Sequence, residues 1–347
     1  MKVLIRLSTI FAIPIIALQF ILFSFNTANG DMAQYLIRYS NVGRLGPGYF
    51  GNLVDIGFNY FMSFAHRFNL DYQGFLILCG ILIFSILIFV CKRYNADYFY
   101  FFFYFLFSFF FIEAVILRQF IASALVSLAF VFLTEDNKWQ KNLVCLSLLV
   151  LASSFHISAL LSFLYFFSYK FSLRKLYYGS FIGLVLSYPL ITMALPIVTR
   201  LLGAKFALYT KGIDASFISF LAKAIFALVS ILLFQLLHDY FVKNSQFYQA
   251  KHQKLASLAL KATLINTLSM PLMLVNISFE RLLLVPVFIY LTTIAVFFRM
   301  KAPFTRQRIF IILLIVAWIF LAYRIFVWSD MKYTTFPILT ENLLWGN

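Results

Sequence analysis

The chain has 347 residues, of which 63% are hydrophobic and only 12% are charged. A soluble domain carries about 25% charged residues, so this composition excludes an ordinary soluble fold, and its hydrophobicity excludes a disordered chain. The class that remains is an all-α, polytopic integral membrane protein. Its net charge of +16 fits the Lys and Arg that cytoplasmic loops collect, so we expect no nucleic-acid partner.

The first predicted element is a membrane span of about twenty apolar residues, which ends at Phe25 and follows Lys2 and Arg6. A cleaved signal peptide has an apolar core of only about 7–15 residues. We therefore predict an uncleaved span with its N-terminus in the cytoplasm.

The longest stretch without a span covers residues 26–72, which we predict to be an outer loop. A Gly-Pro-Gly sequence at 46–48 marks a turn. Beyond it, apolar residues recur on one face of a helix, and Asp55 and Asn59 fall on the other face. Residues 49–68 are thus predicted to form an amphipathic helix that lies at the membrane surface.

Further apolar segments of spanning type follow this loop. Together with the first span they predict about eleven membrane-crossing segments within a single domain, residues 1–347. A run rich in Phe and Tyr at 98–111 is expected to face lipid and neighbouring helices. The predicted spans are 73–91, 97–115, 117–133, 142–155, 157–169, 176–199, 217–239, 255–275, 282–298 and 309–328.

The region 142–169 decides the predicted topology. One straight helix would move the basic clusters at 170–175, 243–254 and 299–308 to the outer side. A hairpin that turns at His156 keeps these clusters in the cytoplasm, as the positive-inside rule requires. We therefore predict two short arms with His156 at their outer turn, and a C-terminus outside.

This topology gathers ionisable residues on the outer side. Charged groups at membrane depth cost about 2.5–3.5 kcal/mol each and are candidates for function. Arg118 offers a planar fork of donors to phosphate or sugar, or it forms a structural ion pair with Glu113. His156 is suited to act as a base or hydrogen-bond donor, or it only ends a helix. The remaining candidates are Asp31, Tyr35, Arg38, Gln119, Lys211 and Arg281.

Neither the histidines nor the cysteines have the spacing of a metal site or a disulfide framework, so we expect no metal and no cofactor. Lys223 and Lys261 fall inside predicted spans. Both are expected to extend their side chains to the nearer membrane surface.

An ordered set of short segments resembles the EpsG-like family of Wzy-type polysaccharide polymerases. The resemblance covers most of the chain in order and spacing. One departure is Gly46, which stands where the family usually has an acidic residue before Pro-Gly, so no catalytic carboxylate is expected at that turn. The segments are Asp31–Tyr35, Gly46–Tyr49, Arg118–Ala122, Phe155–Ala159 and Glu280–Leu282.

The resemblance implies a membrane glycosyltransferase of the bacterial cytoplasmic (inner) membrane. Such enzymes join oligosaccharide repeat units carried on undecaprenyl diphosphate, at the outer face of that membrane, into O-antigen, capsule or exopolysaccharide. It also implies membrane lipid, a chain-length co-polymerase and a flippase as partners. On this reading His156, Arg118 and Glu113 are catalytic. The residues expected to bind substrate are Asp31, Tyr35, Arg38, Gln119, Lys211 and Arg281.

Two other functions remain open at this stage. A flippase or transporter of the same lipid-linked unit would share the outer cations, but it more often has an internal repeat and charges at mid-membrane, which the sequence does not show. A sugar acyltransferase would need a catalytic His and an acid near the cytoplasm, and only His238–Asp239 offers such a pair.

Overall fold

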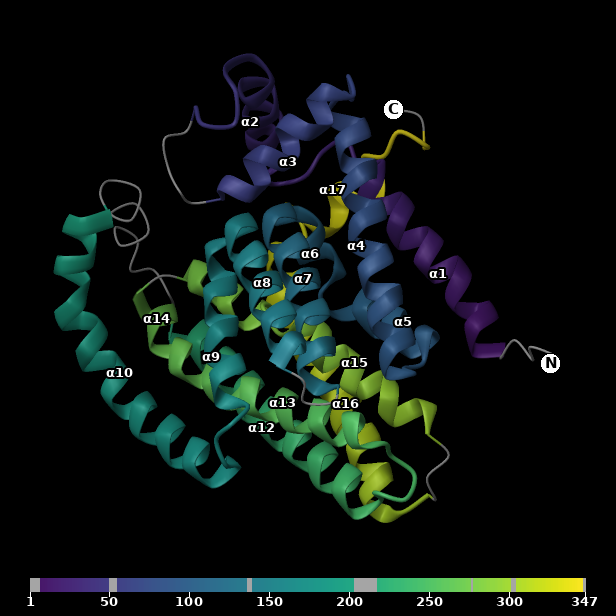
Figure 1. Cartoon of the computed structure of the whole chain (residues 1–347), viewed down its shortest axis with the longest axis vertical. Coiled ribbons are helices and arrows are strands. Elements are labelled where there is room, and N and C mark those ends of the chain that lie inside the picture. Colours follow the sequence, from purple (N-terminus) through teal and green to yellow (C-terminus); the bar gives the residue numbers. More distant parts are fainter. Residues whose placement is uncertain are drawn as a thin grey trace.

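The structure is a computed structural model of the chain and describes residues 7–49, 55–135, 139–202, 217–275, 277–300 and 304–345. Within these ranges the backbone is helical and forms no strand, apart from one isolated antiparallel bridge between Asn26 and Asn342. The prediction of an all-α chain is confirmed for this part of the sequence. Figure 1 shows the helices as one assembly, with a pair of helices covering one end.

The helices are joined mostly by short links. The α-helices are α1 (Leu7–Ser24), α2 (Met32–Leu45), α3 (Ile56–Arg67), α4 (Tyr72–Tyr94), α5 (Tyr98–Ser108), α6 (Phe110–Val115), α7 (Leu117–Thr134), α8 (Trp139–Phe155), α9 (Leu161–Ser168), α10 (Leu173–Leu202), α12 (Phe217–Lys243), α13 (Ala250–Asn266), α14 (Met270–Val275), α15 (Val287–Arg299), α16 (Arg306–Ala322) and α17 (Thr335–Thr340). Tighter or wider turns form η1 (Ile157–Leu160), η2 (Thr267–Ser269), η3 (Ile277–Leu284), η4 (Tyr323–Val327) and η5 (Trp328–Asp330).

Several apolar helices begin at a side chain that caps the helix. The Asp71 carboxylate accepts a hydrogen bond from the Gly74 amide at 2.7 Å and starts α4. Asp97 starts α5 in the same way, and the Thr305 hydroxyl starts α16. Such caps satisfy backbone amides that have no partner within the helix. They explain why the apolar runs become helical at these points.

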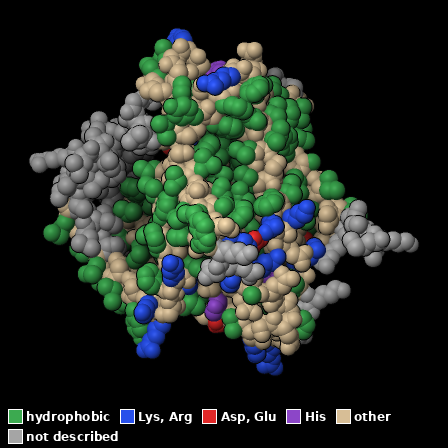
Figure 2. Space-filling view, viewed as in Figure 1, with side chains coloured by type: hydrophobic (Ala, Val, Ile, Leu, Met, Phe, Trp, Pro, Cys, Tyr) green, Lys and Arg blue, Asp and Glu red, His purple; other side chains and the backbone are tan. Residues whose placement is uncertain are grey.

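Seven helical segments of the described chain are long and apolar enough to cross a membrane, which confirms a polytopic membrane protein. The predicted total of about eleven stays a prediction, because α5 and the arm at Ile157–Ser168 are apolar but shorter. Figure 2 shows hydrophobic side chains over most of one face, with Lys and Arg gathered mainly toward its lower part. The seven segments are Leu7–Ser24, Tyr72–Tyr94, Leu117–Thr134, Phe220–Lys243, Ala250–Met273, Phe279–Arg299 and Arg306–Val327.

Helix α7 is the central helix of the bundle. It packs against α4 and α8, and nearly all of its side chains are buried. Small residues let neighbouring backbones approach closely in a membrane protein, and α7 is rich in them. They are Ala122, Ser123, Ala124, Ser127 and Ala129. A helix buried on every side can therefore hold a polar residue in its first turn in a fixed position.

The predicted hairpin at His156 is present. Helix α8 ends at Phe155, and His156 has an extended backbone (φ −152°, ψ 131°), so no single helix runs through 142–169. At the start of α8, the Lys141 ammonium lies 3.2 Å from Glu135, directly after α7. In α9, the Tyr165 ring lies 6.4 Å from that of Phe130, near the same end of α7. The chain therefore runs away from this end and returns to it.

The segment 26–72, predicted to be an outer loop, differs from the prediction in two ways. It contains a second helix, α2, which the sequence analysis missed, and α3 begins at Ile56 rather than at Tyr49, which lies in a turn. Phe58, Met62 and Ala65 on the predicted apolar face of α3 are buried as expected, but Asp55 and Asn59 are buried as well. The polar side of α3 thus faces α2 rather than water.

Helix α3 lies very close to the top of α8. A Cβ atom on Gly57 would overlap the side chain of Ser154, so only glycine permits this approach. The Phe61 and Phe155 rings, 5.9 Å apart, extend the contact. The approach holds the start of α3 beside the hairpin turn at His156. In Figure 1, α2 and α3 lie together over this end of the bundle.

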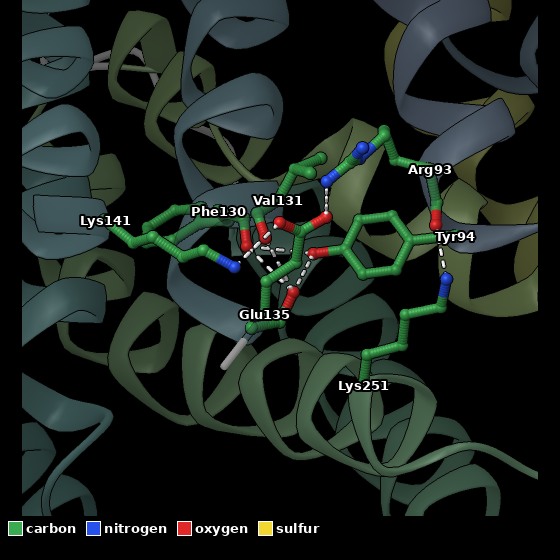
Figure 3. Close-up of polar contacts among 8 residues, drawn as sticks. Arg93, Tyr94, Phe130, Val131, Glu135, Lys141 and Lys251 are labelled. Carbon is green, nitrogen blue, oxygen red and sulfur yellow. Dashed lines mark hydrogen bonds and ion pairs between the residues drawn. The ribbon is translucent and has the colours of Figure 1, made fainter. Parts of the chain in front are cut away.

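At the other end, a polar network ties four helices together (Figure 3). Glu135 accepts hydrogen bonds from Arg93 and Lys141. Lys251 donates to the backbone carbonyl of Arg93 at 2.6 Å. The Tyr94 hydroxyl donates to the backbone carbonyl of Phe130 at 2.9 Å. This end is the one whose basic clusters were predicted to face the cytoplasm.

The prediction that Lys223 and Lys261 extend to the membrane surface is wrong. The Lys223 ammonium is buried and lies 2.6 Å from the Glu280 carboxylate. Both lysines find partners inside the protein, which avoids the cost of reaching past packed helices to water. The Lys261 ammonium donates to backbone carbonyls at 2.7–3.1 Å, those of Ser168, Tyr169 and Phe171.

Replacing Lys261 by Met is expected to destabilise the protein, because it leaves carbonyl groups at the end of α9 without a donor. Loss of a charged donor to a buried acceptor costs about 1–3 kcal/mol. Thermal unfolding of the purified protein in detergent measures the effect. Lys243→Met, at the exposed end of α12, is the control. Equal melting temperatures for the two variants would contradict the role of Lys261 as a helix cap.

Candidate functional site

Two arginines and one aspartate from three distant segments meet at the end of the bundle that α2 and α3 cover. Arg118 lies in the first turn of α7, Arg38 lies on α2, and Asp55 directly precedes α3. Asp55 Oδ2 forms an ion pair with Arg118 Nη1 and lies 3.5 Å from Arg38 Nη1. We call Arg38 and Arg118 the arginine pair.

Neighbouring side chains fix the orientation of both guanidinium groups. Arg38 Nε donates to Asn59 Oδ1 at 2.8 Å, and the Arg38 guanidinium lies 5.8 Å from the centre of the Phe58 ring. Arg118 Nε points to the Tyr35 hydroxyl at 3.5 Å, and its guanidinium lies 5.6 Å from the Tyr35 ring centre. Contacts of this kind hold an arginine in one conformation before a ligand arrives.

The two guanidinium groups face a pocket of about 160 Å³. Their side chains are 17% (Arg38) and 25% (Arg118) exposed, so part of each is open to a ligand. Burial, and next the positive charge of Arg118, lower the pKa of Arg38. The pocket combines cationic donors with carboxylate and amide groups, a mixture that suits a phosphorylated sugar. It is lined by Asp31, Gln34, Tyr35, Ile37, Arg38 and Arg118.

His156 is neutral near pH 7 and has a defined tautomer. Its Nδ1 atom accepts a hydrogen bond from the Ser158 backbone amide at 3.3 Å and lies 2.7 Å from Ser158 Oγ. Because Nδ1 accepts, the proton of the neutral ring lies on Nε2. Burial, and then the positive charge of Arg118, lower the pKa of His156 to about 4. Nδ1 is thus already engaged by Ser158, and Nε2 carries the proton that neutral His156 can donate.

Gln119 and Arg281 meet on the neighbouring face of α7. Gln119 Nε2 donates to the backbone carbonyl of Arg281 at 2.6 Å. This hydrogen bond joins η3 to α7, and the Lys223–Glu280 ion pair joins η3 to α12. The neighbouring positions 118 and 119 thus contact two different parts of this end of the bundle.

Glu113 lies away from the pocket. It is fully buried on α6, and neither carboxylate oxygen has a hydrogen-bond partner among the described residues. In the described structure the ion-pair partner of Arg118 is Asp55, and no ion pair joins Arg118 to Glu113. The ion pair considered as the structural role of Arg118 is therefore present, but its carboxylate is that of Asp55, which directly precedes α3.

The structure thus brings Asp31, Tyr35, Arg38 and Arg118 to one pocket. The charge of Arg118 also acts on His156. Lys211, the remaining predicted residue, lies outside the described residues. Among the residues that the structure describes, no cluster of His, Cys, Asp or Glu is arranged to hold a metal ion.

Sequence reasoning did not select Asp55 as a site residue. It was assigned to the polar face of a surface helix, where a carboxylate is expected to contact water. One signal was available: the chain has only 12 acidic residues, and Asp55 follows the turn where the family's usual acidic residue is missing. Its contact with Arg118 depends on how α3 packs on the bundle, which no local pattern shows.

A family model for the EpsG family matches residues 9–337, nearly the whole chain. The chain belongs to the EpsG family. No individual curated protein and no solved structure matches it.

Membership in the EpsG family suggests an exopolysaccharide-related polymerase of glycosyltransferase type. The seven apolar helical segments indicate a membrane protein, consistent with the inner membrane. The match also extends over α2, α3, α7 and the hairpin, the elements that build the pocket. The EpsG-family chain therefore carries its candidate site within the matched region.

Proposed function

We propose that this chain polymerises oligosaccharide repeat units carried on undecaprenyl diphosphate, at the outer face of the bacterial cytoplasmic membrane. On this proposal about eleven segments cross the membrane, the N-terminus is cytoplasmic, and the pocket at Arg38 and Arg118 faces outward. Membrane lipid, a flippase that delivers the units and a co-polymerase that sets chain length are the expected partners. The product is an O-antigen, capsule or exopolysaccharide.

The proposed reaction is a glycosyl transfer. The bond between the anomeric carbon of the growing chain and its diphosphate oxygen breaks. A bond forms from that carbon to a hydroxyl oxygen of the next repeat unit. Undecaprenyl diphosphate leaves with the electron pair, and the hydroxyl proton passes to a carboxylate or to water. Negative charge thus develops on the leaving diphosphate, which cations in a partly dry site stabilise.

The observation that carries the proposal is the convergence of two oriented guanidinium groups on one pocket. Arg38 and Arg118 come from α2 and α7, and both contact the same oxygen atom of Asp55. Two planar forks at such close range match the oxygens of a diphosphate. A charge cluster built only for stability would not need an adjoining pocket of about 160 Å³.

The remaining residues take roles that fit their chemistry. Asp31 lines the pocket and is suited to accept a hydrogen bond from the attacking hydroxyl. His156, with its proton on Nε2, is suited to donate to a phosphate or sugar oxygen. Tyr35 offers a ring face and a hydroxyl beside Arg118. Gln119 and Arg281 hold η3 against α7, so we propose that they position the outer end.

The size of the surface polysaccharide in cells that lack the gene tests this function. We expect deletion to remove the ladder of long chains on a gel and leave a band that carries a single repeat unit. Loss of the single-unit band as well would favour a flippase, because the units would then fail to reach the outer face. An unchanged ladder would contradict both functions.

A further inference from the structure

Asp55 contacts both of the guanidinium groups that line the pocket, although it is not itself one of the pocket's lining residues. One oxygen, Oδ2, contacts both Arg38 and Arg118. The other oxygen, Oδ1, is buried and has no hydrogen-bond partner among the described residues. The side chain is 7% exposed. The carboxylate is therefore held by the arginines through a single atom.

This geometry differs from that of an ion pair built for stability. An arginine pairs best with a carboxylate when two N–H groups meet two oxygens in a fork. Leaving a buried carboxylate oxygen without a donor is unfavourable. Asp55 instead resembles a small anion, because a single oxygen contacts both guanidinium groups. A ligand with more oxygens can satisfy both guanidinium groups better.

The backbone at Asp55 is also in an uncommon conformation. Its φ of 61° and ψ of 25° lie in the left-handed region, which Asn and Asp enter more readily than other non-glycine residues. The side chain makes no hydrogen bond that caps α3. Local helix capping therefore does not explain why an aspartate stands here, whereas its contacts with the arginines do.

We propose that Asp55 is an internal competitor for the arginine pair and selects ligands that carry two linked phosphate groups. A diphosphate supplies oxygens to both guanidinium groups at once and displaces the carboxylate. A single phosphate group engages the two arginines less completely and is excluded. This selectivity rests on the proposed function, because it concerns the diphosphate of the lipid-linked unit.

The competition also affects product release. After glycosyl transfer, the free undecaprenyl diphosphate carries more negative charge than the bound donor and would remain on the two arginines. Return of Asp55 to Arg118 and Arg38 compensates for the loss of the ligand's charge. When a competitor occupies a site part of the time, the apparent affinity equals the intrinsic affinity multiplied by the fraction of time that the site is open. Weaker binding of the product is the expected consequence.

The test measures binding of inorganic pyrophosphate and inorganic phosphate to the full chain in detergent, by isothermal titration calorimetry. We expect Asp55→Asn to bind pyrophosphate about tenfold more tightly than the wild type, as removal of an occupant present about nine-tenths of the time would predict. We also expect the variant to bind phosphate detectably, whereas the wild type does not. Asn keeps the size of the side chain and tolerates the left-handed backbone.

Asp31→Asn is the matched control. It removes one negative charge from the pocket that both arginines line, but no ion pair joins Asp31 to either arginine among the described residues. A general charge effect would strengthen pyrophosphate binding equally in both variants and would overturn the competitor role of Asp55. Equal affinity of wild type and Asp55→Asn would overturn it as well.

Arg118→Ala separates this inference from the proposed function. If wild type and Asp55→Asn bind pyrophosphate alike and Arg118→Ala does not, the arginine site stands and the competition is wrong. If none of the proteins binds pyrophosphate, the diphosphate site itself is wrong, and the selectivity falls with it. Should Asp55→Asn fail to fold, Asp55→Gly tolerates the same backbone and takes its place, and Asp55→Glu must keep the wild-type preference.

Discussion

Arg118→Ala is expected to abolish long polysaccharide chains while the protein remains in the membrane at its normal level. The guanidinium of Arg118 lies at the pocket and contacts both Tyr35 and Asp55. Removing one donor that stabilises a developing anion costs about 10²–10³ in rate, which is enough to prevent repeated addition. The ladder of chain lengths on a gel, from cells that carry the variant as their only copy, measures the result.

Two further variants show whether the loss reflects the geometry of Arg118 or only its charge. Arg118→Lys keeps the charge but loses the planar fork, so we expect chains that are shorter than normal rather than absent. Arg67→Ala removes an exposed arginine at the end of α3 and should leave the ladder unchanged. Chains of ordinary length from Arg118→Ala, at a normal protein level, would contradict its assignment.

His156→Ala is expected to reduce polymerisation strongly, by up to about 10²-fold, the lower range for a positioned proton donor or acceptor. His156→Gln should keep much of the activity, because the Gln amide can donate from nearly the place of Nε2–H. The rate of polymer formation in membranes measures both. If His156 is a base instead, Gln and Ala will be equally inactive, and the donor role will be wrong.

The pH dependence of the same residue follows from its lowered pKa. In the unfolded chain a histidine titrates near 6.5, whereas burial and the charge of Arg118 lower the pKa of His156 to about 4. The unfolded state therefore takes up the proton first as pH falls. Stability contributed by neutral His156 is complete above pH 6.5 and is lost between about pH 6.5 and 4. Thermal unfolding of wild type and His156→Gln across this range should differ in slope.

Hydrophobic pattern and charge predicted the class of fold, the central span that became α7 and the turn at His156. These features depend on local composition or on the distribution of Lys and Arg between the two sides. A polar residue at the end of an apolar run is conspicuous for the same reason, so Arg118 and His156 stood out. Their proximity to each other followed from the hairpin, which charge counting favoured.

Other features depend on tertiary contacts that no local pattern encodes. Helix α2 is short and carries many polar side chains, so it resembled a loop, although it supplies Arg38 and Tyr35. Asp55 appeared to face water because α2 was not expected to cover it. Lys261 finds backbone carbonyls at the end of α9, a partner that exists only after the hairpin has packed. In each case the missing information was which helix lies alongside.

The most direct test of the central claim is polymerisation by the purified chain in lipid vesicles supplied with repeat units on undecaprenyl diphosphate. The account predicts that polymer forms and that one free undecaprenyl diphosphate appears for each new glycosidic bond. It also predicts that Arg118→Ala forms neither product. Repeat units that cross the membrane or stay bound without being joined, with no undecaprenyl diphosphate released by the wild type, would contradict it.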